Sequence, residues 1–194
     1  MMGPWVAAGI VFLLVLIPWT GAAGFSDEDR ALQKGRSAAY ELSETVRGKL
    51  QESMKSSGPA GAMKVCAYQA EALAEEVAAR QGVAVRRTSL RLRNLKNFPD
   101  AWERALLERL QEMSLTGKVP DDVFEATEAG GKRVYRYAKT LLVGPVCIAC
   151  HGTPSEIPEE VREVLGERYP EDQATGYRQG DLRGIVSVLI PAEE

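Results

Sequence analysis

Histidine is nearly absent from this 194-residue chain: it occurs once, at His151, and cysteine occurs only three times. A metal ion held by two histidines of the same chain is therefore excluded. The formal net charge is only −3, so the excess of basic residues typical of generic nucleic-acid binding is missing. The chain contains no internal repeat, low-complexity tract or linker. Outside the segment described next it shows no acid–base or nucleophilic set, so an enzyme is not expected.

Two of the three cysteines and the single histidine stand together in the segment Cys147-Ile148-Ala149-Cys150-His151. This C-x-x-C-H pattern is typical of a covalently attached c-type haem. Its two thiols can each form a thioether with one vinyl group of the porphyrin, and the adjacent imidazole can bind the iron as the proximal ligand. We therefore predict one covalent haem c, attached at Cys147 and Cys150 and ligated by His151.

Two other sites compete with this interpretation. Cys147 and Cys150 could form a redox-active disulfide, but that arrangement normally opens a helix after a strand. Here glycine and proline flank the motif on both sides, which predicts a loop. Alternatively, Cys66, Cys147, Cys150 and His151 could bind zinc. Because Cys150 and His151 are adjacent, however, their side chains would diverge rather than meet at one tetrahedral ion.

The second axial ligand of the predicted iron cannot be a histidine. It could be Cys66, a methionine such as Met54, Met63 or Met113, a lysine, a tyrosine or solvent, or the position could be open. Cys66 falls on the inward face of a predicted helix, where a cysteine is often only a small apolar side chain. From the residues alone, these alternatives stay open.

The N-terminal segment predicts export. Residues 1–25 contain no charged side chain, residues 6–19 are almost all apolar, and small residues follow at 20–24. We predict that residues 1–24 are a signal peptide, although no lysine or arginine precedes the apolar run. The alternative is an uncleaved membrane anchor formed by residues 4–23. Residues 25–194 would then be a single periplasmic or otherwise exported domain, in contact with a membrane only if the anchor is retained.

The pattern of elements after residue 25 predicts an α+β domain with a mainly antiparallel sheet. Ser26 with Asp29, and Asp100 with Glu103, have the spacing of helix capping boxes. Gly130-Gly131 has the character of a tight hairpin turn. The predicted elements are helices from 26 and over 60–80, separated by a break at 56–59, a strand over 83–90, a helix from 100, strands over 123–128 and 132–143, a helix over 158–165 and a strand over 182–190.

Between residues 77 and 99 the charged side chains are all basic. The commoner interpretation of such a run is a solvated strand face. The functional interpretation is that one or two of its arginines, such as Arg87 and Arg91, pair with the haem propionates, which need cationic partners when partly buried.

Five ordered blocks of the chain resemble a bacterial family of single-haem c-type domains that was first described structurally from a cyanobacterial cytochrome. The blocks are residues 62–66, 87–94, 98–103, 147–152 and 176–184. The resemblance covers nearly all of the chain after the signal segment. It implies a PAS-like fold with N-terminal helices packed around the sheet, and a haem attached at the motif cysteines. It also implies that His151 and Cys66 are the two axial ligands.

Two functions fit these expectations. The first is a redox or small-ligand sensor that responds to a diatomic gas and acts on a signalling protein, because PAS-like haem domains with Cys/His iron are typical of sensors. The alternative is a periplasmic electron-transfer cytochrome that docks to a redox partner protein through the acidic stretch 156–172.

Overall fold

The computed structural model describes residues 25–192, so the predicted signal segment 1–24 lies outside the described residues. Among residues 25–192, no helix combines the length and hydropathy that crossing a bilayer requires. The elements are, in chain order, α1 (Asp27–Tyr68), α2 (Ala70–Gln81), β1 (Ala84–Thr88), η1 (Leu95–Asn97), α3 (Ala101–Ser114), β2 (Asp122–Ala129), β3 (Lys132–Leu142), η2 (Pro145–Cys147), α4 (Ile148–His151), α5 (Glu159–Arg168) and β4 (Leu182–Pro191).

The four strands form one sheet in the order β1-β4-β3-β2, and every neighbouring pair is antiparallel. The hairpin between β2 and β3 turns at Gly130 and Gly131, whose φ angles of 60° and 75° suit the predicted tight turn. The last strand, β4, inserts between β1 and β3, so that Val188 pairs with both Val85 and Tyr137. The predicted α+β architecture with a mainly antiparallel sheet is confirmed.

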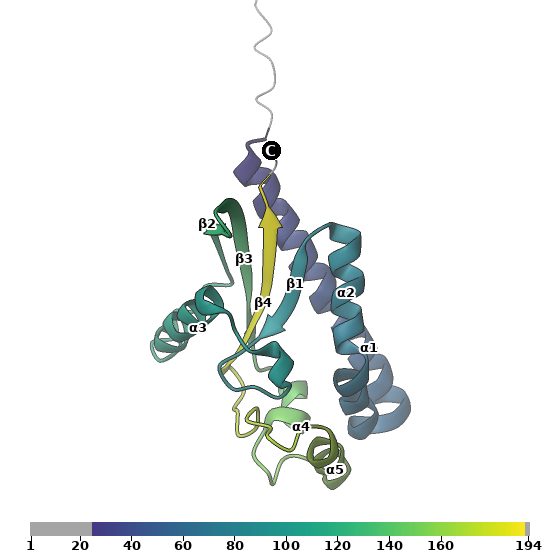
Figure 1. Ribbon diagram of the computed structural model, residues 1–194. Helices are drawn as coiled ribbons and strands as arrows, with labels where there is room; N and C mark the ends of the chain where they lie inside the picture. Colours follow the sequence, from purple (N-terminus) through teal and green to yellow (C-terminus); the bar gives the residue numbers. More distant parts are fainter. Residues whose placement is uncertain (1–24, 193–194) are drawn as a thin grey trace, which may run out of the picture.

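The sheet is covered on both faces (Figure 1). Helices α1 and α2 bury Leu42 and Val77 against strand residues that include Val188. On the opposite face, α3 buries its leucines, among them Leu107, against Ile185 of β4. Successive side chains of a strand therefore point into two different apolar cores, as expected for a sheet buried on both sides.

Helix α1 approaches the sheet closely because it carries a glycine there. A Cβ built on Gly35 would lie 2.6 Å from the Cβ of Tyr137, a distance too short for two side chains.

The capping boxes predicted at Ser26 and at Asp100 are both present, so the start of α1 and the start of α3 are confirmed.

The predicted break between the first two helices is present, but the second helix differs from the prediction. Gly58, inside α1, has φ 65° and ψ −168°, which is not helical. The helix predicted over 60–80 is also interrupted, at Gln69, where α1 ends and α2 begins. The last part of α1, residues 59–68, therefore begins after the non-helical Gly58 and ends at Gln69, a turn residue whose φ and ψ stay in the right-handed helical region.

Candidate functional site

The C-x-x-C-H motif follows β3 after four intervening residues and leads into the lobe below the sheet, where α4 and α5 lie (Figure 1). The loop predicted for the motif is wrong: the 3-10 turn η2 ends at Cys147 and the α-helical turn α4 ends at His151. One local reason is Pro145, whose fixed φ suits the first position of a helical turn. The turn brings both cysteines and the histidine onto one short stretch of rigid backbone.

The three cysteines are free, so no disulfide joins Cys147 to Cys150. Burial raises the pKa of the Cys150 thiol to about 11, and a nearby Cys66 adds to this effect. A nucleophilic redox thiol needs the opposite shift. Within residues 25–192, no cluster of three or more His, Cys, Asp or Glu side chains is arranged to hold a metal ion.

His151 is oriented for ligation. Its Nδ1 lies 2.7 Å from the carbonyl oxygen of Ala174. Because a carbonyl only accepts, Nδ1 carries the proton and Nε2 keeps a lone pair, which is the tautomer that binds a metal. Burial, together with Arg183 and Arg93 nearby, lowers the pKa of His151 well below its ordinary value. The backbone N–H of Tyr177 also donates to the His151 carbonyl, 2.9 Å away.

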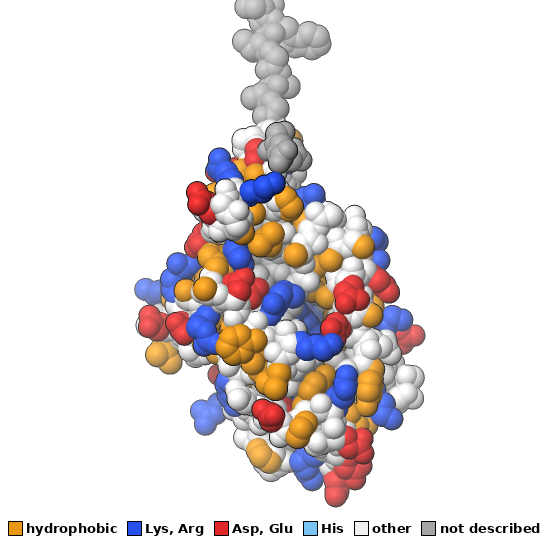
Figure 2. All heavy atoms as spheres, in the orientation of Figure 1, with side chains coloured by type: hydrophobic (Ala, Val, Ile, Leu, Met, Phe, Trp, Pro, Cys, Tyr) orange, Lys and Arg blue, Asp and Glu red, His pale blue; other side chains and the backbone are white. Residues whose placement is uncertain are grey.

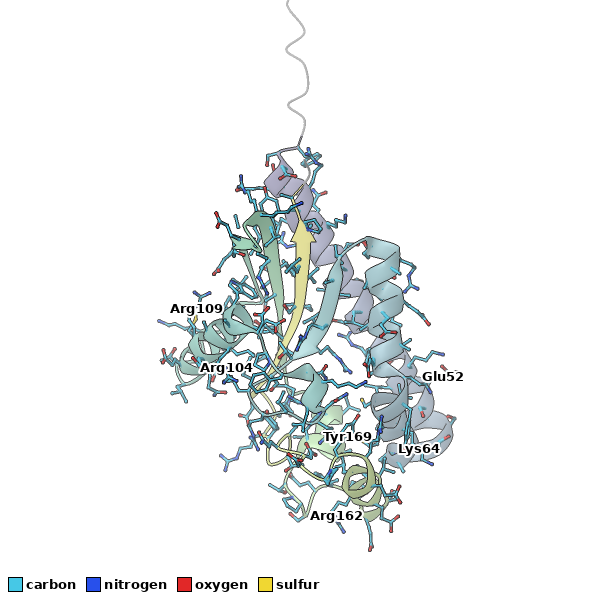
Figure 3. All side chains as sticks on the ribbon, viewed as in Figure 1. Glu52, Lys64, Arg104, Arg109, Arg162 and Tyr169 are labelled. Atoms are coloured by element: carbon cyan, nitrogen blue, oxygen red, sulfur yellow. The ribbon has the colours of Figure 1, made fainter. Side chains whose placement is uncertain are left out.

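A cavity of about 530 Å³ lies between the helices, the β1–β4 edge of the sheet and the motif, and both Cys66 and His151 line it. This volume is in the range of protein sites for small molecules and cofactors. Figure 2 shows basic side chains gathered around a hollow on this face. Tyr169, which also lines the cavity, lies between α4 and α5 (Figure 3).

The two motif cysteines pack in apolar clusters outside the lining of this cavity. Cys150 packs in an apolar cluster with Cys66, while Cys147 packs in a second one with Ala174 and Tyr177. Neither is among the residues that line the cavity itself. Of the three motif side chains, His151 is thus the one that lines the cavity, and Cys150 packs in the same cluster as the lining residue Cys66.

The alternatives to Cys66 as second ligand are placed less favourably. None of the methionines Met54, Met63 and Met113 is among the residues that line the cavity. Lys96 does line it, but its Nζ lies 2.9 Å and 3.1 Å from the carboxylate oxygens of Glu71. Among the cysteine, methionine and lysine candidates in residues 25–192, Cys66 is thus the side chain that shares the cavity with His151 without such a partner; Tyr68 and Tyr169 line the cavity as well.

The two arginines predicted to hold propionates differ in their surroundings. Arg87 lines the cavity, whereas Arg91 is not among its lining residues. The guanidinium of Arg91 instead lies 4.2 Å from the ring centre of Tyr177 and donates to the carbonyl of Gln173 over 3.0 Å. Arg183, which sequence reasoning missed, lines the cavity.

The cavity has an excess of positive charge. Its basic residues Arg86, Arg93 and Lys96 have carboxylate partners. Arg87 and Arg183 have no ion pair within residues 25–192, although both are half-buried. Half-buried guanidinium groups require anionic partners, so the cavity suits a ligand that carries carboxylates.

Comparisons with known proteins give one family. A sequence profile of the Tll0287-like family matches residues 26–191. A solved structure, the crystal structure of the cyanobacterial heme-protein Tll0287, is similar with a TM-score of 0.65 and 28% sequence identity, and the match covers 85% of this chain and 97% of that one. No curated protein matches the chain significantly. The predicted α+β, PAS-like fold class is thereby confirmed.

Proposed function

Because the chain belongs to the Tll0287-like family, as its sequence blocks predicted, we propose that it is a haem protein with one haem c attached at Cys147 and Cys150. The observation that carries the proposal is the cavity that Cys66 of α1 and His151 of α4 line together. The two residues are far apart in the sequence, and the fold brings them to one space. The similar cyanobacterial structure is that of a heme-protein, which supports the same ligand here.

The residues present fit this group. Nε2 of His151 is free to bind iron, because Nδ1 donates to Ala174. Cys66 would be the second axial ligand, and Arg87 and Arg183 would hold the propionates. When bound, the haem would supply an iron that exchanges one electron and that takes up a small gas at an open position.

We favour a redox or gas sensor. Cys66 lies in the helical segment 59–68, which the non-helical Gly58 separates from the rest of α1 and which ends at the turn residue Gln69. A haem iron bound here would hold the anionic sulfur of Cys66 less strongly when reduced than when oxidised, so reduction would favour release of Cys66. The segment would then move with Cys66 and present a changed surface to a signalling protein.

The alternative is an electron-transfer cytochrome. It is favoured by the exposed glutamates of α5 and its flanks, which follow the motif directly and include Glu159, Glu160 and Glu163. Figure 2 shows acidic side chains at the lower end of the molecule, where α5 lies. A basic redox partner could dock there. In both proposals the protein is exported to the periplasm and is not an enzyme. Residues 1–24 would be cleaved as a signal peptide, or residues 4–23 would be retained as a membrane anchor.

The test of the cofactor is the intact mass of protein coexpressed with the haem-attachment machinery, together with its reduced pyridine haemochrome spectrum. We expect the mass of the processed chain plus one haem. The double variant Cys147→Ala/Cys150→Ala should lack that mass. A colourless wild-type protein with the mass of the bare chain would overturn the proposal.

Carbon monoxide separates the two roles. A sensor whose Cys66 withdraws should bind carbon monoxide when reduced, at a rate limited by that withdrawal. Cys66→Ala, in which the position is already open, should bind faster and without the limit. If the reduced wild-type protein keeps its coordination and does not bind carbon monoxide, the electron carrier is the correct function.

A further inference from the structure

One buried ion pair includes Arg93, which lines the cavity but is outside the set of proposed ligands. Arg93, in the segment after β1, is 9% exposed, and its guanidinium is paired with the carboxylate of Asp172 at 3.0 Å. A buried pair of this kind is weak evidence for stability, because desolvating both charges offsets their attraction. The other contacts of the pair indicate a second role.

The pair holds the peptide group that His151 uses. Nη2 of Arg93 donates to the carbonyl oxygen of Ala174 over 3.1 Å, and Nδ1 of His151 donates to the same oxygen over 2.7 Å. On the other side of this residue, the N–H of Ala174 donates to Oδ1 of Asp172 over 2.8 Å. The acceptor of the histidine is thus fixed by both members of the ion pair.

The same guanidinium also reaches the elements that carry the other functional residues. Nη2 of Arg93 donates to the carbonyl oxygen of Cys150 over 2.5 Å. Nη1 lies 3.7 Å from Sδ of Met63, which is fully buried one helical turn before Cys66. Arg93 therefore contacts both the motif and the segment of α1 that faces it.

We propose that Arg93 is a positioning residue that sets the reduction potential of the iron through His151. The inference rests on the proposed haem binding. Because a cationic donor shares the Ala174 carbonyl, that oxygen accepts less strongly from the imidazole, and His151 has less imidazolate character. The buried cation also disfavours the extra positive charge of ferric iron. Both effects raise the potential.

The experiment is a potentiometric titration of haem-loaded variants. Arg93→Gln should lower the potential, with at least a tenfold change in the ferric-to-ferrous ratio, which is 59 mV for one electron. Asp172→Asn should raise the potential, because the amide oxygen still accepts from Ala174 while the negative charge is lost. Arg178→Gln is the matched control: it removes the same charge from an exposed side chain of the loop that carries Asp172 and Ala174, and it should leave the potential unchanged.

Arg93→Lys separates position from charge, because an ammonium group keeps the charge but not the planar fork of donors. We expect a fall in the same direction as in Arg93→Gln, but smaller. A potential equal to that of the wild type in Arg93→Gln or Arg93→Lys would overturn the inference. If Arg93→Gln does not fold, the absence of a rise in Asp172→Asn overturns it instead. Loss of haem from the wild-type protein would contradict the proposed function, which the mass and haemochrome measurements detect separately.

Discussion

Replacing Gly58 with alanine tests whether the bend in α1 places Cys66. Gly58 has φ 65° and ψ −168°, a region that residues with a Cβ rarely adopt. A Cβ at this position would meet no atom within 4 Å, so the cost is in the backbone alone. We expect Gly58→Ala to reduce the free energy of unfolding by about 1–3 kcal/mol.

Gly48→Ala is the matched control on the same helix. Gly48 is exposed, lies in regular helix, and has no atom within 4 Å of its ideal Cβ. Alanine is favoured over glycine there by about 0.5–1 kcal/mol, so this variant should be more stable than the wild type. The same chemical change in one helix should therefore act with opposite signs at its two positions.

Urea unfolding of the haem-loaded proteins measures both free energies. In thermal unfolding, each kcal/mol should correspond to about 2–4 °C for a domain of this size. Because relief of the strain at Gly58 would move segment 59–68, Gly58→Ala should also change the absorption spectrum of the ferric protein, whereas Gly48→Ala should not. Equal stabilisation by the two substitutions, with unchanged spectra, would refute the reasoning.

Two further predictions concern packing and pH. Leu165→Ala and Leu107→Ala each empty a buried leucine site and should cost about 2–5 kcal/mol in urea unfolding. Only Leu165→Ala should alter the absorption spectrum, because the apolar cluster around Leu165 includes Cys66, whereas the cluster around Leu107 lies under α3. Altered spectra in both variants would contradict this prediction. The hydrogen bond from Trp102 lowers the pKa of Glu125, so this carboxylate stabilises the fold above its ordinary pKa, and the contribution is lost as the pH falls through the lowered value. Trp102→Phe should therefore be less stable than the wild type at neutral pH, with a difference that shrinks in acid; a difference independent of pH in urea unfolding would count against it.

Signals that act between neighbours in the sequence predicted much of the fold. The capping boxes at Ser26 and Asp100 and the turn at Gly130-Gly131 depend on hydrogen bonds and φ angles within a few residues. Gly58 marks a helix break for the same reason. Gln69 carries no such signal: it is neither glycine nor proline, and α2 begins after it without a side-chain cap.

The chemistry of the candidate site was predictable from one motif and one resemblance, but its supporting residues were not. Arg183 reaches the cavity because β4 inserts between β1 and β3, which is a long-range pairing. Arg93 belongs to a basic run that indicates a solvated face, yet it is buried against Asp172. Arg91, from the same run, is held by backbone carbonyls away from the cavity. A basic run in a sequence does not show which of its side chains a distant segment will cover.

The electron paramagnetic resonance spectrum of the ferric protein, recorded beside that of Cys66→Ala, tests the central claim most directly. The account predicts the low-spin signature of a thiolate and an imidazole on one iron in the wild type. It also predicts that this signature is lost in Cys66→Ala. A spectrum without thiolate character, or one that Cys66→Ala leaves unchanged, would contradict the claim that Cys66 and His151 hold the iron between them.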